Sequence, residues 1–305
     1  MLKGTEADSV KHQDGTQSLL EGFREHGRGF EDFVYAYPVL SRRARGLSLG
    51  LNLSPHKACN FDCLYCQVDR SVPGKTKTVS MELLETELSA LLELTLSGEI
   101  FKVGKFTSAP EGLRRLNDIA LSGDGEPTSE PVFEEVCQLL ARFKEEGKIP
   151  KDTKLVVITN ATRFHLEKVE RGLQMLDPHE GEVWAKLDAG TEEYYQKVDL
   201  SKVPFERVIE NLVLIASRRP VKVQTLFFEM EGEGPDAREL DAYCSILEKM
   251  LVAGGKILEV QLHTVARDPK NHVALPLVSE ELEGYAEMLR KRTGLEVSVY
   301  PGLRG

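Results

Sequence analysis

The sequence predicts an α/β fold, specifically a partial, open (β/α)6 barrel of the TIM type with parallel strands. Short apolar runs rich in β-branched residues alternate along the chain with amphipathic stretches of helical length. This alternation is typical of βαβ units around a parallel sheet. Only about six such units are present, whereas a closed barrel of this type needs eight. We therefore expect a barrel that is open on one side.

The predicted strands are short apolar segments bounded by turn residues. They lie at 47–53, 118–122, 154–159, 182–187, 221–230 and 257–264, with a candidate extra strand at 296–300. The predicted helices repeat apolar residues at a helical period and lie at 80–96, 130–144, 205–216, 236–251 and 279–292. Ser80 is positioned to cap the first of these helices. The segment 98–117 is an insertion in which the pattern predicts no particular element.

The chain is predicted to divide into an N-terminal extension, residues 1–37, and a barrel domain, residues 38–305. Residues 1–17 are polar and show no hydrophobic period, so we expect them to be disordered. Residues 18–36 carry several phenylalanines and are predicted to form a short helix. Because α/β barrels often use a chain of this length as one domain, we expect a single domain after residue 37.

The composition is that of an ordinary globular protein. The 305 residues are 41% hydrophobic and 29% charged, with a formal net charge of −10. No apolar run approaches the roughly 18 residues of a membrane helix, and no secretory signal is visible at the start. We therefore expect a cytoplasmic monomer without membrane contact. The acidic balance disfavours a broad nucleic-acid surface, although it is compatible with a local basic patch.

The five cysteines are too few and too unevenly placed for a disulfide framework, and three of them fall within one short loop. That loop has the spacing Cys59-x3-Cys63-x2-Cys66 and follows the first predicted strand. Three thiolates can bind three irons of a cubane cluster, which leaves the fourth iron open to a small-molecule chelate. Cys137 and Cys244 lie at helical spacing among apolar residues, and we interpret them as core residues.

A structural zinc site is the alternative interpretation of this loop. Structural zinc usually takes four protein ligands, commonly in paired Cys-x2-Cys motifs. Only one such pair is present here, and His56 is too close in sequence to supply a typical second half. The spacing therefore favours an iron–sulfur centre.

The loop CNFDCLYC resembles the signature of the radical S-adenosylmethionine (SAM) superfamily. This resemblance implies one [4Fe–4S] cluster held by Cys59, Cys63 and Cys66, with SAM bound at the open iron. It implies that SAM is cleaved reductively to a 5′-deoxyadenosyl radical, which abstracts hydrogen from a substrate that the sequence does not assign. It also implies that the backbone of Tyr65, the aromatic residue before the third cysteine, contacts the adenine. A flavodoxin or ferredoxin is the expected electron donor.

Polar residues at the ends of later strands extend the predicted cofactor site, since reactive groups of such barrels lie at the carboxyl ends of the strands. The segment SGDGEP resembles the glycine–glutamate motif of the superfamily, which holds the amino group of SAM, although Asp124 replaces a more usual glycine. The strand end ITN is expected to supply a contact to the ribose, and the strand end KLD a contact to the ribose or to the substrate. The predicted cofactor residues of these segments are Gly123, Asp124, Gly125, Glu126, Asn160 and Asp188.

Each of these strand ends also has a plainer interpretation. The glycine-rich segment is compatible with an ordinary turn, Asn160 with a turn or helix cap, and Lys186 with a surface ion pair to Asp188. At the end of the sixth predicted strand, Gln261, His263 and Arg267 are polar where a buried strand should finish, and we interpret them as substrate-side residues.

The order of these motifs over roughly residues 38–285 resembles the branch related to the wyosine-base synthase, a tRNA-modifying enzyme. True synthases of that kind bind a second cluster through cysteines upstream of the signature loop. Because no cysteine precedes Cys59, we expect a single cluster. The leading hypothesis is a radical SAM enzyme with an unassigned, small-molecule substrate. A tRNA-modifying enzyme and an iron–sulfur electron-transfer or scaffold protein are the alternatives.

A basic segment, Arg42, Arg43 and Arg45, precedes the first predicted strand in this otherwise acidic chain. Clustered cations attract acidic partners at long range. The segment is therefore expected to dock an acidic electron donor, to bind a phosphate-bearing substrate such as tRNA, or simply to be solvated.

Overall fold

The sheet at the centre of the protein contains the strands that the sequence pattern predicts, together with one that it misses. The computed structural model describes residues 30–41, 46–266, 269 and 272–302. Within these residues, eight strands form one sheet in chain order. They are β1 (Ala36–Ser41), β2 (Gly46–Leu51), β3 (Leu116–Leu121), β4 (Lys154–Thr159), β5 (Gly181–Lys186), β6 (Val221–Leu226), β7 (Ile257–His263) and β8 (Val297–Tyr300).

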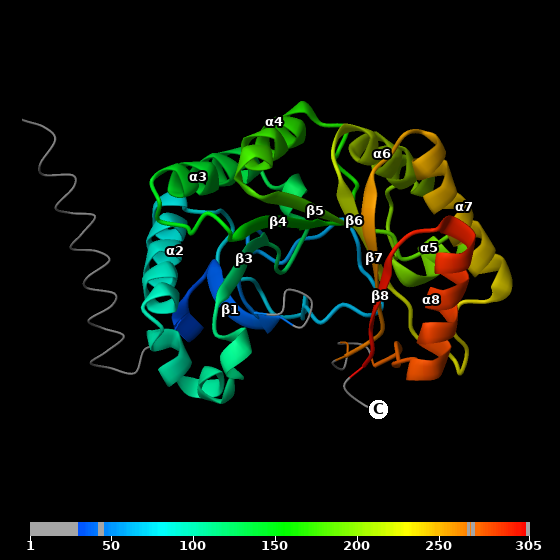
Figure 1. Cartoon of the computed structure of the whole chain (residues 1–305), viewed down its shortest axis with the longest axis horizontal. Coiled ribbons are helices and arrows are strands. Elements are labelled where there is room, and N and C mark those ends of the chain that lie inside the picture. Colours follow the sequence, from blue (N-terminus) through cyan, green and yellow to red (C-terminus); the bar gives the residue numbers. More distant parts are fainter. Residues whose placement is uncertain (1–29, 42–45, 267–268, 270–271, 303–305) are drawn as a thin grey trace, which may run out of the picture.

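All neighbouring strands from β2 to β8 are parallel, and only β1 runs antiparallel to its neighbour. The sheet curls without closing, so the predicted open α/β barrel is confirmed (Figure 1). The candidate extra strand at 296–300 is also confirmed, because β8 extends the sheet beyond β7.

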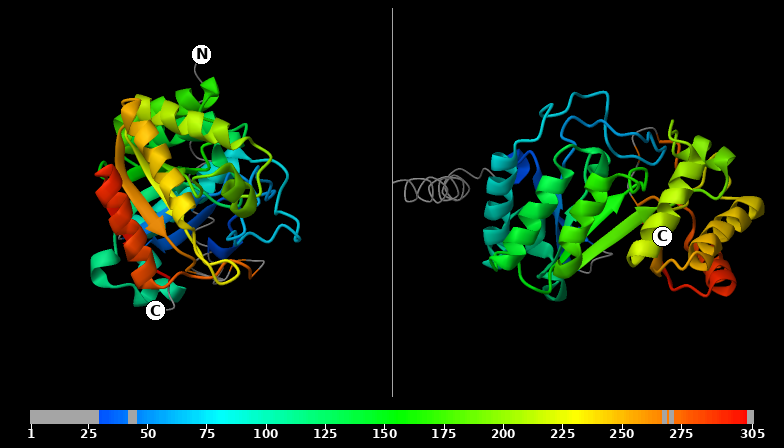
Figure 2. Two further views of the ribbon diagram at one scale, coloured as in Figure 1. Left: turned by 90° about the vertical axis from the view of Figure 1, so that its right-hand side faces the viewer. Right: turned by 90° about the horizontal axis from the view of Figure 1, so that it is seen from above.

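The helices lie on the outer, convex side of the curled sheet (Figures 1 and 2). No helix in the described part of the chain is long and apolar enough to cross a bilayer. Ser80 caps the first helix as predicted, since its side chain accepts the Leu83 N–H. The helices are α2 (Met81–Leu96), α3 (Phe133–Glu145), α4 (Glu167–Leu176), α5 (Glu192–Val198), α6 (Phe205–Arg218), α7 (Ala237–Val252) and α8 (Ser279–Thr293).

Alternation along the strands separates a main core from an inner face. Leu47, Leu49 and Leu51 of β2 are fully buried and pack in the same core as Leu84 and Leu88 of α2. The residues between the β2 leucines face the inside of the half-barrel. A separate apolar cluster lies on that inner face, formed by Ala120, Val156, Ile158 and Trp184.

A ladder of alternating charges lies on the same inner face near the amino ends of the strands. Glu182 pairs with Lys154 of the preceding strand and with Lys222 of the following strand, the latter at 3.3 Å. Lys222 also contacts Glu259 at 3.5 Å, and the Trp184 indole N–H donates to Glu182 at 2.8 Å. Because these two lysines and two glutamates are mutually paired, they leave no net charge on this part of the inner face.

Strand β1 is the main error of the sequence prediction, which assigned residues 18–36 to a helix. Residues 18–29 lie outside the described residues, Phe30–Asp32 is a short 3-10 helix, and Ala36 already begins β1. The carboxylate of Glu87 in α2 accepts the backbone N–H groups of Val34, Tyr35 and Ala36 at 2.8, 2.8 and 3.1 Å. A helical residue more than fifty positions away therefore fixes the entry into this strand.

The other differences concern short elements. Helices α4 and α5 were not predicted, and β6 ends at Leu226 rather than at residue 230. The insertion 98–117 forms three 3-10 helices, Glu99–Lys102, Gly104–Ser108 and Glu111–Leu113. Ile100 and Phe106 of this insertion are fully buried, so it packs against the core.

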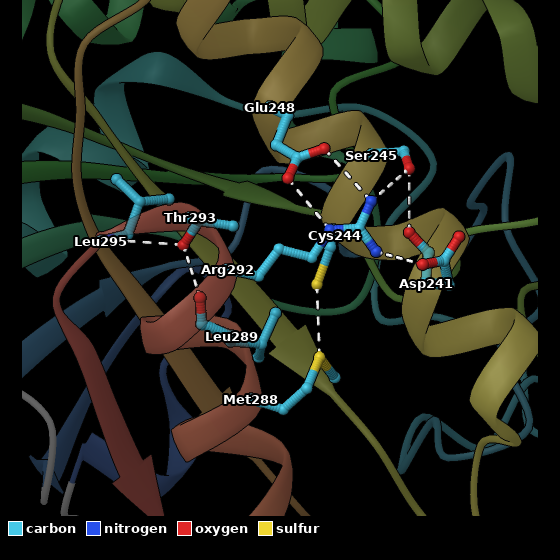
Figure 3. A network of polar contacts seen from close by, with 9 residues as sticks. All are labelled: Asp241, Cys244, Ser245, Glu248, Met288, Leu289, Arg292, Thr293 and Leu295. Atoms are coloured by element: carbon cyan, nitrogen blue, oxygen red, sulfur yellow. Dashed lines mark hydrogen bonds and ion pairs between the residues drawn. The ribbon is translucent and has the colours of Figure 1, made fainter.

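Helices α7 and α8 are joined by a polar network around Arg292 (Figure 3). The Arg292 guanidinium donates to Glu248 at 3.0 Å and to Ser245 at 2.9 Å, and it also pairs with Asp241. Beside it, the Cys244 sulfur lies 3.6 Å from the Met288 sulfur. Cys244 is thus a packing residue between two helices, as predicted.

Candidate functional site

A cavity of about 560 Å³ lies inside the half-barrel, at the carboxyl ends of the parallel strands. The structure brings every predicted metal or cofactor residue to its wall. These residues are Cys59, Cys63, Tyr65, Cys66, Gly123, Asp124, Gly125, Glu126, Asn160 and Asp188. Of the predicted substrate-side residues, His263 lines this cavity, Gln261 is buried on the inner face, and Arg267 lies outside the described residues. The basic segment 42–45 also lies outside the described residues.

The cysteine loop connects β2 to α2 and forms no regular helix or strand. It runs along one edge of the sheet in the right-hand view of Figure 2, where it is blue to cyan. The segment after α5 holds it in place: the Asp62 N–H donates to the Asp199 carbonyl at 3.0 Å, and the Leu64 N–H donates to the Val198 carbonyl at 2.9 Å. The fold therefore orders the loop through backbone hydrogen bonds.

The three thiols have different surroundings. Cys59 accepts the Phe61 N–H at 3.5 Å, Cys63 lies 3.3 Å from the Asp199 carboxylate, and Cys66 accepts a guanidinium N–H of Arg70 at 3.3 Å. Burial, followed by the charge of Asp199, holds the pKa of Cys63 well above its ordinary value. Burial also raises the pKa of Cys59. Metal binding must therefore displace protons from these thiols.

The three thiols line one cavity, but they are not placed as the ligands of a single metal ion. Among the described residues, no group of three or more His, Cys, Asp or Glu side chains is placed to hold one metal ion. A cubane cluster does not need such convergence, because each thiolate binds a different iron. Cys137 and Cys244 are fully buried in α3 and α7, which confirms the prediction that they belong to the core.

Tyr65 links the cysteine loop to the end of β5. Its hydroxyl group donates to Asp188 and accepts from Lys186, whose ammonium lies 3.3 Å from Asp188 and 4.3 Å from the centre of the Tyr65 ring. The second oxygen of Asp188 accepts the Leu226 N–H at 2.8 Å. Burial lowers the pKa of Lys186, but Asp188 and nearby acidic groups outweigh it and raise that pKa above its ordinary value. The predicted Lys186–Asp188 pair is therefore present, inside the cavity rather than at the surface.

Glu126 is buried and its carboxylate is already engaged by the protein. One oxygen accepts the backbone N–H of Thr128 at 3.0 Å and the Thr159 hydroxyl at 2.7 Å, and the other accepts the Asn160 N–H at 2.7 Å. Burial raises the pKa of Glu126, although these hydrogen bonds lower it in part. The carboxylate thus ties the end of β3 to the end of β4.

The glycines of the same segment allow it to pack tightly against the chain that follows β2. A side chain on Gly125 would meet the Ala58 carbonyl oxygen and, at 2.6 Å, the Ser54 hydroxyl oxygen. Gly123 has φ +144, and a side chain there would lie 2.5 Å from the Asn52 amide oxygen. Asp124 accepts an N–H of the Asn52 amide at 2.8 Å. Only glycine fits this approach, so the segment is more than an ordinary turn.

Asn160 also contacts the cysteine loop directly. Its amide donates to the Asn60 side chain at 2.7 Å, and Asn60 in turn donates to the Thr162 hydroxyl at 2.7 Å. Three residues that touch the loop or its thiols were not predicted from the sequence, namely Asn60, Arg70 and Asp199. Asn60 and Arg70 were recognisable only as polar residues within or beside the motif. Asp199 lies 136 positions from Cys63, and no local pattern marks it.

Comparison with known proteins identifies the family. A family model described as the radical SAM superfamily matches residues 53–244, which include the cysteine loop and the ends of β3, β4 and β5. The chain belongs to the radical SAM superfamily. Membership of the radical SAM superfamily implies an enzyme that uses a [4Fe–4S] cluster and SAM, in agreement with the resemblance seen in the sequence.

Curated relatives of this radical SAM protein have varied names. A protein called GTPase Obg from Brachyspira hyodysenteriae is 25% identical over 301 residues, which cover 97% of this chain but 38% of that protein. A UPF0026 protein of Helicobacter pylori is 27% identical over 269 residues, which cover 84% of this chain and 76% of that protein. The chain therefore spans well under half of the first of these relatives and about three quarters of the second.

Solved structures of other proteins share the fold. A structure of TYW1 with a lysine–pyruvate adduct bound has a TM-score of 0.53 at 16% identity, covering 96% of this chain and 91% of the other. Streptococcus suis SuiB bound to S-adenosylmethionine has a TM-score of 0.54 at 11% identity, covering 93% and 56%. At identities of 16% and 11%, these similarities establish the shared fold alone.

Proposed function

We propose that this protein reductively cleaves SAM at a single [4Fe–4S] cluster held by Cys59, Cys63 and Cys66, and that it takes hydrogen from a substrate bound inside the half-barrel. The observation that carries the proposal is that the three thiols and the segment Gly123–Glu126 line one cavity. A bound cluster would supply one electron to SAM, which splits into methionine and a 5′-deoxyadenosyl radical. The protein would supply position and electrostatics.

The roles of the cofactor residues follow from which polar groups remain available. The Glu126 carboxylate is engaged by Thr128, Thr159 and Asn160, so we assign it the role of shaping the strand ends. We assign the amino group of SAM to Asp124 and the backbone carbonyls beside it. Asn160, whose amide also bonds Asn60 and Thr162, keeps its predicted contact to the ribose, and the backbone of Tyr65 would contact the adenine. Asp188 would hold Tyr65 in place.

The inner face deeper in the cavity is the proposed substrate side. Its apolar part is formed by Ile158 and Trp184, which line the cavity. Its polar part includes Gln224, which donates to the buried Gln261 at 3.1 Å, and a stacked pair of rings from His263 and Tyr300 with centroids 4.7 Å apart. A pocket with an apolar wall and a few fixed polar groups suits a small organic molecule.

Anaerobic reconstitution followed by product analysis tests this proposal. The protein should bind about four irons and four sulfides per chain, and with dithionite and SAM it should release 5′-deoxyadenosine. Replacing any one of Cys59, Cys63 and Cys66 by alanine should abolish both properties. Cys244→Ala is the matched control and should retain the cluster. Binding of about eight irons would contradict the single-cluster assignment, and a loaded protein that forms no 5′-deoxyadenosine would contradict the proposed reaction.

A tRNA substrate is the second candidate, because the order of the motifs resembles that of the wyosine-base synthase branch, whose members modify tRNA. The net charge of −10 argues against it. Binding of transfer RNA that weakens steeply with added salt would favour it, since contacts to phosphates release counterions. We also propose a flavodoxin or ferredoxin as the physiological reductant, which a turnover assay with purified donors would test.

A further inference from the structure

Within the described part of the chain, Arg70 is a cation that contacts a predicted cluster ligand directly. Its Nη1 donates to the Cys66 sulfur at 3.3 Å, and the same nitrogen lies 3.6 Å from the Asp62 carboxylate. Its Nε donates to the backbone carbonyl of Lys57 at 3.2 Å. The side chain of Arg70 is 28% exposed, so the guanidinium is partly shielded from solvent.

The loop itself fixes the guanidinium in this position. Lys57 has a positive φ of 63, and its carbonyl accepts from Arg70. In return, the Lys57 ammonium donates to the backbone carbonyls of Asp69 and Val72 at 3.0 and 3.1 Å. These reciprocal bonds connect the chain before Cys59 with the chain after Cys66. Arg70 is therefore held beside the thiol by both ends of the loop.

Among the contacts that the structure describes, no guanidinium donates to either of the other two thiols. Cys59 accepts a backbone N–H at 3.5 Å, and Cys63 faces the carboxylate of Asp199. A charged donor forms a stronger hydrogen bond to a thiolate than a neutral donor does. A bound cluster would therefore have a directly bonded cation on its Cys66 side, whereas on its Cys63 side the negative charge of Asp199 stands near the positive charge of Lys186.

We propose that Arg70 is a positioning residue that raises the reduction potential of the cluster through its hydrogen bond to Cys66, an inference that rests on the proposed function. Reduction adds one negative charge to the cluster. A cationic donor on a ligand sulfur stabilises the reduced form more than the oxidised form, and hydrogen bonds to the sulfurs are among the features that set the potentials of iron–sulfur clusters. The guanidinium therefore allows a weaker reductant to reduce the cluster.

Three variants separate the hydrogen bond from the charge. Arg70→Gln removes the charge, whereas Arg70→Lys keeps the charge but loses the planar guanidinium that reaches the sulfur and the Lys57 carbonyl together. Lys75→Gln is the matched control, because it removes one positive charge from the same loop. Lys75 donates to the Phe33 carbonyl at 2.5 Å, and no thiol is among its described partners.

The measurement is a redox titration of the reconstituted cluster without SAM, in which electron paramagnetic resonance monitors the reduced cluster and gives the midpoint potential. We expect Arg70→Gln to make reduction at least tenfold less favourable, which for one electron is a shift of about 59 mV to more negative potential. Arg70→Lys should shift in the same direction by less. Lys75→Gln should stay near the wild-type potential. Only the loaded fraction gives a signal, so partial loading of a variant does not prevent the measurement.

Equal potentials for Arg70→Gln and Lys75→Gln would overturn the inference. If Arg70→Gln assembles no cluster, Arg70→Lys decides, and a wild-type potential in that variant would overturn the inference as well. Failure of the wild-type protein to assemble a cluster is a different result, because it contradicts the proposed function before the role of Arg70 is tested. The two hypotheses therefore fail separately.

Discussion

Replacing Glu126 by alanine should destabilise the protein even when no cofactor is present. The change leaves the buried N–H groups of Thr128 and Asn160 without their acceptor, and each unsatisfied buried donor costs about 1–3 kcal/mol. The sum is about 2–6 kcal/mol. Burial raises the pKa of Glu126, so removing the buried charge offsets part of the loss. We therefore expect Glu126→Ala to lower the free energy of unfolding by about 2 kcal/mol. This loss is a large share of a typical folding free energy of about 5–15 kcal/mol.

Urea unfolding of the apo-protein, compared with SAM binding, tests this assignment of Glu126. Asp124→Ala is the matched control, because it removes a neighbouring carboxylate whose described partner is the side chain of Asn52. Asp124→Ala should weaken SAM binding and change stability little. Since the folded pKa of Glu126 is raised, its contribution to stability declines as the pH rises through that pKa. The difference in unfolding free energy between wild type and Glu126→Ala should therefore be larger at about pH 5 than at about pH 8. If the unfolding free energy of Glu126→Ala lies within about 0.5 kcal/mol of the wild-type value, the structural role assigned to Glu126 is refuted.

Three further results are expected. Gly125→Ala should lower iron loading, because the new methyl group meets the backbone of the cysteine loop. Gly112→Ala is the control, because its methyl group enters open space and should leave iron loading unchanged. Equal iron loading of the two variants would contradict the close approach at Gly125. Trp184, the only tryptophan in the sequence, lines the cavity, so its fluorescence should change on SAM binding, and an unchanged spectrum at saturation would exclude that occupancy. The amides of Asp62 and Leu64 should be protected from hydrogen exchange in the iron-free protein, and full exchange within seconds would show that the loop is ordered only by the cluster.

Much of the fold was predictable because its strands carry their own signal. The run KLVVIT, bounded by a turn and a polar strand end, was predicted as 154–159 and forms β4 with the same bounds. Ser80 likewise capped α2 as expected from its type and place. Strand β1 was not predictable in the same way, because Glu87 sits in an amphipathic helix where a glutamate is ordinarily exposed. Its burial, with 3% of its surface exposed, arises only when the helix packs over the chain entering β1.

The site shows the same division between local and distant information. The spacing of Cys59, Cys63 and Cys66 and the following glycines is local, and the residues it indicated all reach one cavity. The role of Glu126 was not local, since its second oxygen binds a backbone group 34 positions away. A motif therefore predicts which residues meet, but not which of their atoms remain available to a ligand.

The way the cysteine loop is held has a consequence for how a cluster would bind. In small domains that fold around a metal, binding free energy and folding free energy are the same quantity. Here the loop is connected to the rest of the fold at three points, through Asn60 to Asn160, through Tyr65 to Asp188, and through backbone bonds to the segment at Asp199. The partners belong to the ends of β4 and β5 and to the chain after α5, which the packed sheet fixes. Because these contacts are made by protein groups alone, a cluster would meet a loop that is already ordered, and part of its binding free energy would offset the proton release that the buried Cys63 requires.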